Sequence, residues 1–418
     1  MQKIKVLVVG SGCREHAIVR SLLEDQNISA IYTLPERISL KDTIDIPSAL
    51  LNDFEALADY LKKENIELVV IGPEKVLVEG LADVLRNREI GVFGPCSKSA
   101  QLEGSKIFAK EFMKAEGIPT ASYHIVSSVS EVLHASENFF PPYVLKADGL
   151  AGGKGVFICH NRLELEEKSQ FLFDKKALGS AGEKALLEDF QKGQELSVFV
   201  ITDGDFYQFL PVAQDYKRLY EGQKGPNTGG MGAIAPVSIS SELLKAIEDK
   251  IVKPTLEGLK KRDCVYRGVL YLGLMIHKNF PKVLEYNVRF GDPEAQVLLP
   301  LLEGSWLDVF YKIAQAKKLN LNWKKKYSVS VVLCAENYPE GPLNSVPIEG
   351  LIYAQKDHSW FVHGSLTRRE DQWFTQGGRV LNSVAIGDNK KQAVQRAYQH
   401  IKGVSWKGMR YRKDIGQS

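Results

Sequence analysis

The first hundred residues alternate between short apolar runs and stretches with helical spacing. The first run, KIKVLVVG from Lys3 to Gly10, is rich in β-branched residues, and apolar positions at helical intervals follow it as far as Leu23. Strands that alternate with helices in this way are typical of a parallel sheet. The same alternation continues with helices expected at 54–64 and 81–88 and strands expected at 67–71 and 90–93.

The middle of the chain has a different pattern, in which strands flank glycine-rich loops. A helix is expected to begin at Ser105 and to end before Gly117. The apolar run 269–276 and the run that begins at Lys282 lie on either side of Asn279, and this spacing predicts a β-hairpin. Further elements are expected as strands at 143–148 and 184–190 and as a helix at 243–259.

The last hundred residues predict a small α+β domain. Its polar residues form no catalytic pattern, and His363 is expected to be structural. The expected elements are strands at 327–334, 351–354 and 379–386 and a helix at 391–401.

Composition narrows the class of protein. A chain of 418 residues is expected to form two to four domains, and its formal charge of +3 includes no long run of one sign that would favour a nucleic-acid or membrane surface. The five cysteines are far apart in the sequence, which argues against a disulfide framework or a zinc site. No apolar run approaches the roughly 20 residues that span a bilayer, and no signal-peptide pattern is present. A cytoplasmic protein is expected.

The stretch 282–294 carries the most informative chemistry. It begins as an apolar strand, in which Glu285, Asn287 and Arg289 are expected on one face and Leu284, Tyr286 and Val288 in the core. Oxygen ligands hold magnesium and share it with phosphate, and a guanidinium adds a fork for a further anion. The alternative is an ordinary exposed strand face with an ion pair.

A glycine-rich loop follows the strand that carries Lys146. Residues 149–155 contain four glycines together with Lys154, and a strand resumes at Val156. Glycines let the backbone wrap closely over phosphates, and a lysine adds positive charge. The loop is not a Walker A motif, because no helix opens behind it. It is typical of a flap over a triphosphate, and a plain hairpin is the alternative.

Three further stretches carry polar groups that a nucleotide or substrate needs. A ring can pack on Phe190, and Glu195 can accept hydrogen bonds from both ribose hydroxyls. The segment 214–232 is polar and glycine-rich without a core face, and it is expected to be a functional loop or a disordered one. The turn after the first strand is not a dinucleotide fingerprint, because Glu15 stands where a third glycine is required, although a helix N-terminus can still hold an anion.

These segments together resemble the phosphoribosylamine–glycine ligases, also called glycinamide ribonucleotide synthetases, of the ATP-grasp superfamily. The resemblance extends from Lys3 to about Gly416. The most specific segments are Gly12–His16, Gln101–Lys106, Lys146–Ala151, Gly225–Gly232 and Arg289–Glu294.

The resemblance implies a fold of the mixed α/β and α+β class. It implies a pre-ATP-grasp domain with a parallel sheet at residues 1–102, an ATP-grasp domain at 103–325 with a flap lobe at about 121–195, and a small α+β domain at 326–418. It also implies a reaction in which glycine attacks the γ-phosphate of ATP and the amine of 5-phosphoribosylamine displaces phosphate from the glycyl phosphate. A monomer without nucleic-acid or membrane partners is expected.

The resemblance also implies residue roles. The expected metal ligands for Mg²⁺ or Mn²⁺ are Glu285 and Asn287, without a second acid on the preceding strand. The expected catalytic residues are Arg289 and Asp292. The residues expected to bind ATP are Lys106, Lys146, Gly152, Gly153, Lys154, Gly155, Glu188, Phe190 and Glu195. The residues expected to bind the other substrates are Gly12, Arg14, Glu15, His16, Glu74, Asp215, Lys217, Asn227, Thr228 and Gly229.

The sequence departs from the family pattern on the substrate side. The family has a Pro-Gly-Asn-x-Gly loop where this chain has Pro35-Glu36-Arg37-Ile38-Ser39, and Glu36 would repel an anion that Arg37 could attract. Val76 replaces a proline, and Tyr216 stands at a common histidine position. Two alternatives therefore stay open: a homologous ligase with another amine substrate, and a nucleotide-binding protein without turnover.

Overall fold

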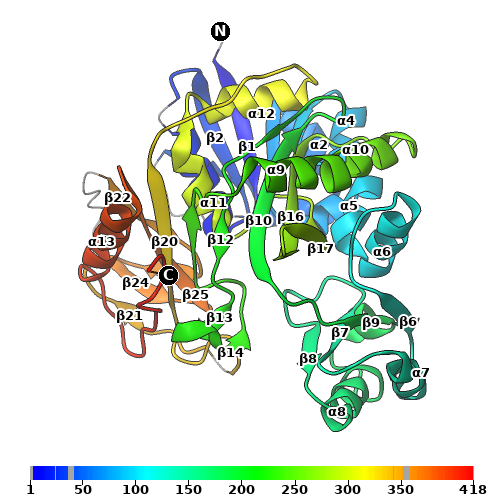
Figure 1. Ribbon diagram of the computed structural model, residues 1–418. Coiled ribbons are helices and arrows are strands. Elements are labelled where there is room, and N and C mark those ends of the chain that lie inside the picture. Colours follow the sequence, from blue (N-terminus) through cyan, green and yellow to red (C-terminus); the bar gives the residue numbers. More distant parts are fainter. Residues whose placement is uncertain (1–2, 24, 36–41, 342, 352–357, 418) are drawn as a thin grey trace.

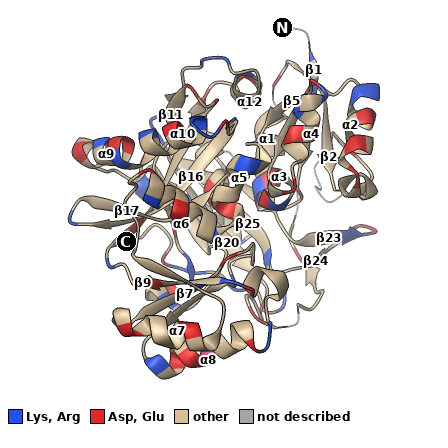
Figure 2. Cartoon of the chain, turned by 90° about the vertical axis from the view of Figure 1, so that its right-hand side faces the viewer, with Lys and Arg blue, Asp and Glu red and all other residues tan. Residues whose placement is uncertain are grey.

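The computed structural model describes residues 3–23, 25–35, 42–341, 343–351 and 358–417 (Figure 1). The parallel sheet and α12 lie at the top of this view, a small lobe with α7 and α8 lies at the lower right, and the C-terminal strands lie at the lower left. No helix within these ranges is both long and apolar enough to cross a membrane. In Figure 2 the helices on one side of the molecule carry acidic and basic residues side by side.

The N-terminal sheet is parallel, as predicted, with the strand order β3-β2-β1-β4-β5. Alternation along β1 places Leu7 and Val9 in one apolar core and Val6 and Val8 in another, so both faces of the sheet are covered. The strands are β1 Ile4–Val9, β2 Ile28–Leu34, β3 Thr43–Asp45, β4 Leu68–Ile71 and β5 Gly91–Phe93. The helices are α1 Cys13–Leu22, η1 Ser48–Asn52, α2 Phe54–Lys63, α3 Glu74–Val78, α4 Leu81–Asn87 and α5 Ser97–Gly104.

The small lobe has a four-stranded antiparallel sheet, in the order β6-β9-β7-β8, and an apolar core of its own. Leu145 and Leu187 from the sheet pack there with Leu165 and Leu172 from α8. The glycine-rich segment 148–155 joins β7 to β8, as predicted. The elements are β6 Tyr123–Val126, α7 Val129–Ala135, η2 Ser136–Asn138, β7 Tyr143–Ala147, β8 Val156–Cys159, α8 Arg162–Phe173, η3 Gly179–Gly182 and β9 Ala185–Asp189.

The middle of the chain forms a second antiparallel sheet, in the order β11-β10-β16-β17. The predicted hairpin is present, and Lys278 and Asn279 turn it with positive φ angles. The elements are α6 Lys106–Ala115, β10 Gln194–Thr202, β11 Tyr207–Phe209, α9 Ser241–Ile247, a π-helical stretch at Glu248–Val252, α10 Lys253–Lys260, β16 Gly268–His277 and β17 Phe280–Asn287.

One detail of β17 differs from the prediction. Gly273 pairs with Glu285 whereas Leu274 pairs with Val283, so the register shifts at Leu284. This extra residue is a β-bulge, and it interrupts the strict alternation of side chains. Val283 is fully buried, while Leu284 is only half-buried. The expectation that Leu284 lies in the core was therefore wrong.

The C-terminal strands form an antiparallel sheet together with β12 and β15 from the middle of the chain, in the order β12-β15-β20-β25-β22, and α13 packs on this sheet. The segment 214–232 was expected to be a loop, but it contains β12, the hairpin of β13 and β14, and the first residue of β15. Of the strand expected at 351–354, residues 352–354 lie outside the described ranges. The strands are β12 Gln214–Asp215, β13 Arg218–Tyr220, β14 Lys224–Asn227, β15 Gly232–Ala235, β18 Leu302–Glu303, β19 Asn322–Trp323, β20 Tyr327–Cys334, β21 Pro347–Ile348, β22 Ser359–His363, β23 Leu366–Arg369, β24 Gln372–Thr375 and β25 Arg379–Gly387. The helices are η4 Glu221–Gln223, α11 Glu294–Leu298, η6 Leu299–Leu301, α12 Trp306–Ala314 and α13 Lys390–Ile401.

Candidate active site

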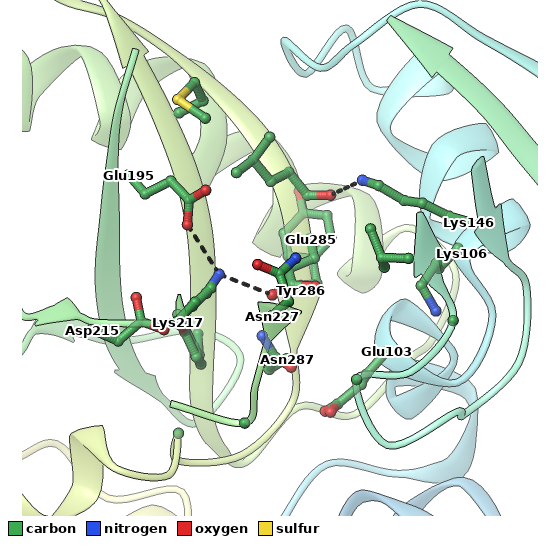
Figure 3. A pocket seen from close by; sticks show the side chains of 18 of the residues that line it. Glu103, Lys106, Lys146, Glu195, Asp215, Lys217, Asn227, Glu285, Tyr286 and Asn287 are labelled. Atoms are coloured by element: carbon green, nitrogen blue, oxygen red, sulfur yellow. Dashed lines mark hydrogen bonds and ion pairs between the residues drawn. The ribbon is translucent and has the colours of Figure 1, made fainter. Parts of the chain in front are cut away.

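A cleft of about 780 Å³ lies between the small lobe, α6, the end of β17 and the segment 214–229 (Figure 3). It gathers predicted residues that are far apart in the sequence. Those that line it are Arg14, Glu74, Lys106, Lys146, Gly152, Gly153, Gly155, Glu188, Phe190, Glu195, Asp215, Lys217, Asn227, Thr228, Gly229, Glu285, Asn287, Arg289 and Asp292. Four predicted residues are not in its lining: Gly12, Glu15, His16 and Lys154.

The end of β17 places Glu285 and Asn287 on the wall of the cleft. Gly273 faces Glu285 across the hairpin, and a Cβ atom there would lie 3.0 Å from Glu285 Cγ, so the missing side chain leaves room for the carboxylate. Enclosure acts to raise the pKa of Glu285, but Lys217, Lys146 and Lys106 outweigh it and lower the pKa. Glu285 is therefore an anionic oxygen donor beside an amide oxygen.

These two donors fit a divalent cation that is shared with a ligand. Among the described residues, no group of three or more His, Cys, Asp or Glu side chains could hold a metal without help. Hard cations such as Mg²⁺ are commonly bound by one or two protein oxygens together with phosphate oxygens. One carboxylate and one amide on β17 are consistent with that mode of binding and with no dedicated protein cage.

The small-lobe wall contains a buried carboxylate with two ammonium groups. Glu188 Oε2 lies 3.0 Å from Lys146 Nζ and 3.2 Å from Lys110 Nζ, and all three residues are buried. Lys146 also donates to the backbone carbonyl of Leu284 at 3.2 Å, which connects this lobe to β17. The other oxygen of Glu188, Oε1, is buried without a hydrogen-bond partner in the described part of the chain. An acceptor of this kind is costly unless a ligand donates to it.

Lys110 was missed in the sequence. Its ammonium also donates to Thr120 Oγ1 at 2.8 Å and to the carbonyl of Ala121 at 3.2 Å, at the start of the small lobe. Burial lowers its pKa to about 8, against the opposing effect of Glu188. Lys110 lies on α6, and its side chain is buried where the small lobe contacts this helix.

The start of α6 is tied to the glycine-rich loop. Ser105 caps the helix by accepting from Phe108 N at 3.0 Å, and Asp148 Oδ1 accepts from Ile107 N at 2.8 Å and from Ser105 Oγ at 2.9 Å. Lys106 Nζ donates to the carbonyl of Gly149 at 3.3 Å, and burial lowers its pKa. The lysine in the first turn is therefore held beside the loop that was predicted to cover phosphates.

Arg289 is fixed between two carboxylates. Its Nη2 lies 2.5 Å from Glu103 Oε1, and its Nε lies 3.2 Å from Glu74 Oε2. Burial acts to raise the pKa of Glu74, but Arg289 and Arg14 together lower it to about 2. Glu103 was quoted in the sequence motif without a role, and the structure shows that it anchors the guanidinium.

The opposite wall is acidic around one lysine. Lys217 Nζ lies 3.3 Å from Glu195 Oε2 and 3.7 Å from Glu285 Oε1 (Figure 3). Burial raises the pKa of Asp215 to about 7, although Lys217 acts to lower it. Burial acts to lower the pKa of Lys217, and the carboxylates of Asp215, Glu285 and Glu195 together raise it well above its ordinary value.

At the turn before α1, the carboxylate of Glu15 occupies the position at the helix N-terminus where a phosphate could bind. Glu15 is buried, accepts from Gly12 N at 2.8 Å and lies 2.6 Å from Arg14 Nε. A Cβ atom on Gly10, which has a φ of 115°, would lie 2.5 Å from Glu15 Cγ. The site at the start of α1 is thus filled by the protein, and Glu15 acts on the cleft through Arg14.

His16 lies away from the cleft, in contact with the C-terminal region. Its ring centroid is 4.6 Å from that of His363, and burial lowers the pKa of both imidazoles, to about 4 for His363. Both histidines are therefore neutral near pH 7, and the structural role of His363 stays a prediction.

A C-terminal residue completes the lining. Arg379 on β25 donates to the carbonyl of Gly229 at 2.6 Å and to the carbonyl of Asp292 at 2.7 Å, and its Nη2 lies 3.0 Å from Asp292 Oδ2. It connects Gly229, which was predicted to bind substrate, with Asp292, which was predicted to be catalytic, yet nothing in the local sequence distinguishes it from a surface arginine. Its position depends on β25 lying in the same sheet as β15.

The positions at which the sequence departs from the family pattern are only partly described by the structure. Residues 36–41 lie outside the described ranges. Tyr216 and Val76 are buried rather than exposed to a substrate. The Tyr216 ring lies under Arg412, with 5.1 Å from its centroid to Arg412 Cζ, and its hydroxyl accepts from Gly416 N at 3.0 Å.

Comparisons with known proteins cover almost the whole chain. Family models for phosphoribosylglycinamide synthetase match residues 4–103 as the N domain, 104–295 as the ATP-grasp (A) domain and 328–418 as the C domain. The phosphoribosylamine–glycine ligase of Caldanaerobacter subterraneus subsp. tengcongensis is 39% identical over 415 residues, which cover 99% of each chain.

Solved structures agree with these matches. The crystal structure of phosphoribosylamine–glycine ligase from Thermotoga maritima has a TM-score of 0.86 and 34% identity, and covers 99% of this chain and 100% of that chain. The biotin carboxylase–βγ-ATP complex of Campylobacter jejuni has a TM-score of 0.73 at 14% identity, covering 99% of this chain and 94% of that chain, and shares the fold alone. The chain belongs to the phosphoribosylamine–glycine ligase family, the ATP-dependent ligases of de novo purine biosynthesis with an ATP-grasp fold.

Proposed function

We propose that the cleft performs the reaction of this family through glycyl phosphate. In the first step a carboxylate oxygen of glycine forms a bond to the γ-phosphorus of ATP, and ADP leaves. In the second step the amine of 5-phosphoribosylamine attacks the acyl carbon, loses a proton and expels phosphate, which leaves glycinamide ribonucleotide. One observation carries the proposal: Lys146, on the small lobe, and Glu285, on β17, line the same cleft.

The nucleotide would lie between the small lobe and β10. Phe190 offers a ring face to adenine, and the unpartnered Glu188 oxygen is an acceptor that the amino group of adenine would satisfy. Glu195 would accept from the ribose hydroxyls, and Lys106 and Lys146 would contact phosphates with the backbone of Gly152, Gly153 and Gly155. Lys154 would approach only by a movement of the loop. The ATP complex of biotin carboxylase, which shares the fold, supports ATP as the nucleotide.

Glu285 and Asn287 would hold Mg²⁺ or Mn²⁺. When bound, the ion would supply positive charge that is shared between the protein oxygens and the phosphate oxygens. Lys217 would then exchange part of its contact with Glu285 for contact with anionic ligands.

The protein's own cations counter the repulsion between two anions. A glycine carboxylate approaches a polyanionic nucleotide only where positive charge is already fixed in place. Glu74 and Glu103 hold the Arg289 guanidinium still, and it would face the developing acyl phosphate. Asp292 would position the adjacent loop through Arg379.

The remaining predicted residues would form the substrate side. Asp215 and Lys217 offer groups of both signs for a zwitterion such as glycine, and Asn227, Thr228 and Gly229 offer neutral polar groups. Arg14 and Glu74 would complete this side. Gly12 and Glu15 would act by orienting Arg14, and His16 by supporting the contact with the C-terminal region.

Several expectations stay predictions. The division at residues 102 and 325 is supported by the ranges of the family models, although β12 and β15 share a sheet with the C-terminal strands. A monomer and a cytoplasmic location are proposed from composition and from the purine-pathway relatives.

A coupled assay of ADP release tests the proposal. Purified protein with ATP, Mg²⁺ and glycine should release ADP only when 5-phosphoribosylamine is generated in situ. Release with a different amine would favour the homologous ligase instead. ATP binding without release under any of these conditions would overturn the proposal.

A further inference from the structure

The cations that line the cleft differ in whether a carboxylate of the protein pairs with them. Within the described residues most of its lysines and arginines lie in ion pairs with carboxylates. The paired cations are Arg14 with Glu15, Lys110 and Lys146 with Glu188, Lys217 with Glu195 and Glu285, Arg289 with Glu74 and Glu103, and Arg379 with Asp292. Lys106 and Arg218 also line the cleft, and neither forms an ion pair in the described part of the chain. Two of the cations that line the cleft are thus not held in an ion pair by the protein.

These two cations lie on different segments. Lys106 stands at the start of α6, beside the glycine-rich loop, where the nucleotide phosphates are proposed to bind. Arg218 follows Lys217 at the start of the β13–β14 hairpin. Lys106 and Lys217 lie on opposite walls of the cleft (Figure 3). The cleft therefore has a second candidate anion position, away from the first.

The hairpin around Arg218 offers donors and no acid to the cleft. Its lining residues beyond Arg218 are Gln223, Asn227, Thr228 and Gly229. Thr228 and the Gly229 N–H already donate to the Lys217 carbonyl and the Tyr338 hydroxyl, so the neutral donors left for a ligand are the side-chain amides of Gln223 and Asn227. Arg218 Nη1 donates to the carbonyl of Gly225 at 2.8 Å, which leaves its other N–H groups for a ligand. A guanidinium with neutral donors beside it suits a phosphate, whose oxygens accept several hydrogen bonds at once.

A buried arginine holds this hairpin in place. Arg412 is 2% exposed, and its Nη1 donates to the carbonyl of Arg218 and to Gln223 Oε1, each at 3.0 Å. Asp414 pairs with Arg412 at 2.7 Å and accepts from Gly222 N at 2.9 Å. A two-stranded hairpin is marginally stable by itself, so its position at the cleft depends on such contacts.

We propose that Arg218 binds the phosphomonoester of the amine substrate, and that Arg412 is a positioning residue for it. The identity of this ligand as 5-phosphoribosylamine rests on the proposed function. The phosphomonoester carries a net negative charge near neutral pH, and the cations that are already paired with carboxylates are less able to balance it. Arg218 supplies that charge on the wall opposite the nucleotide lysines.

Ligand binding tests the proposal without turnover. With the nucleotide site saturated by the β,γ-methylene analogue of ATP and Mg²⁺, calorimetry should detect binding of ribose 5-phosphate, and ribose should bind much more weakly. Arg218→Gln should weaken ribose 5-phosphate binding on the order of tenfold to a hundredfold, as expected for a lost charged hydrogen bond. Affinity for the ATP analogue should stay within about twofold.

A matched control is Lys224→Gln, which removes an exposed cation on β14 that does not line the cleft. It should bind ribose 5-phosphate like the wild type. If both variants lost affinity for ribose 5-phosphate equally, the effect would come from the overall positive charge of the protein, and the proposal would be wrong. An Arg218→Gln variant with unchanged affinity for ribose 5-phosphate would also overturn it.

Kinetics separate this inference from the proposed function. Arg218→Gln should raise KM for 5-phosphoribosylamine on the order of tenfold or more while KM for ATP and glycine changes little, and Arg218→Lys should recover part of the loss. If the wild type turns over and Arg218→Gln has an unchanged KM for 5-phosphoribosylamine, the role of Arg218 is wrong while the proposed function stands. Arg412→Gln should raise the same KM and should also increase hydrogen–deuterium exchange in residues 218–229, and unchanged exchange there would overturn the positioning role.

Discussion

Lys217 Nζ lies 3.7 Å from Glu285 Oε1, so the carboxylate proposed as a metal ligand has a protein cation beside it. A second carboxylate, Glu195, lies 3.3 Å from the same ammonium. Lys217 thus partly balances two acids that are proposed to bind ligands, and its removal should change metal affinity in a defined direction.

Lys217→Met should bind Mn²⁺ more tightly than the wild type when nucleotide is absent. The increase should be roughly five- to tenfold, because a unit charge at this distance contributes about 1 kcal/mol in a water-like medium. Electron paramagnetic resonance of free Mn²⁺ measures it. Lys224→Met serves as the control, and an affinity that is unchanged or lower in Lys217→Met would contradict the role of Lys217 as a local counter-charge.

Glu285→Gln should lower kcat by about a hundredfold or more, because the amide cannot supply the negative charge that a divalent ion needs. Steady-state ADP release measures the effect. Glu303→Gln, at an exposed position on β18, should be unaffected. A Glu285→Gln rate within a few-fold of the wild type would mean that the metal ligand lies elsewhere.

Asp215 should make stability depend on pH. Burial raises its pKa from 3.8 to about 7, so between these values the folded protein holds a proton that the unfolded chain has released. The free energy of unfolding therefore falls as the pH rises through this window, and the contribution of Asp215 levels off above it. Urea denaturation over the window should give a shallower pH dependence for Asp215→Asn than for the wild type.

Asp371→Asn, at a fully exposed side chain, is the control for that series. Burial also raises the pKa of Glu103 to about 7, and this contribution is common to all three proteins. Parallel curves for the wild type and Asp215→Asn would show that Asp215 ionises normally in the folded state.

Lys110→Met should weaken ATP binding by about tenfold. Without the second ammonium, Glu188 keeps only Lys146 and loses a group that fixes its orientation. Calorimetry with the β,γ-methylene analogue measures the affinity. The control is Lys114→Met, at an exposed position one turn further along α6, which should bind the ATP analogue like the wild type. Equal affinities of the two variants for the analogue would show that Lys110 does not contribute to nucleotide binding.

Local patterns predicted the elements well where a regular period determines burial. The parallel sheet and the hairpin at Asn279 follow from alternation and turn residues alone. The β-bulge at Leu284 could not be predicted in this way, because it arises from the pairing of two strands and leaves no mark in the composition of either. The short strands of 214–232 were missed because a two- to four-residue strand has no period of its own.

The site was predictable where one segment carries several functional groups. Glu285 and Asn287 share β17, and Arg289 follows two residues after its end, so their closeness in sequence brought them together. Arg379 and Arg412 contribute from β25 and from the segment after α13, and their roles depend on long-range packing that no local motif encodes. Glu15 shows the reverse case, since it belongs to a recognisable motif but acts through Arg14.

The most direct test follows an oxygen atom. Glycine labelled with ¹⁸O in its carboxylate should be supplied with ATP, Mg²⁺ and 5-phosphoribosylamine, and the released phosphate analysed by mass spectrometry. If the carboxylate attacks the γ-phosphate, the amine later expels phosphate with that oxygen attached, and each phosphate carries one ¹⁸O atom. Phosphate without label, with the displaced ¹⁸O atom recovered in water instead, would contradict an acyl phosphate formed in this cleft.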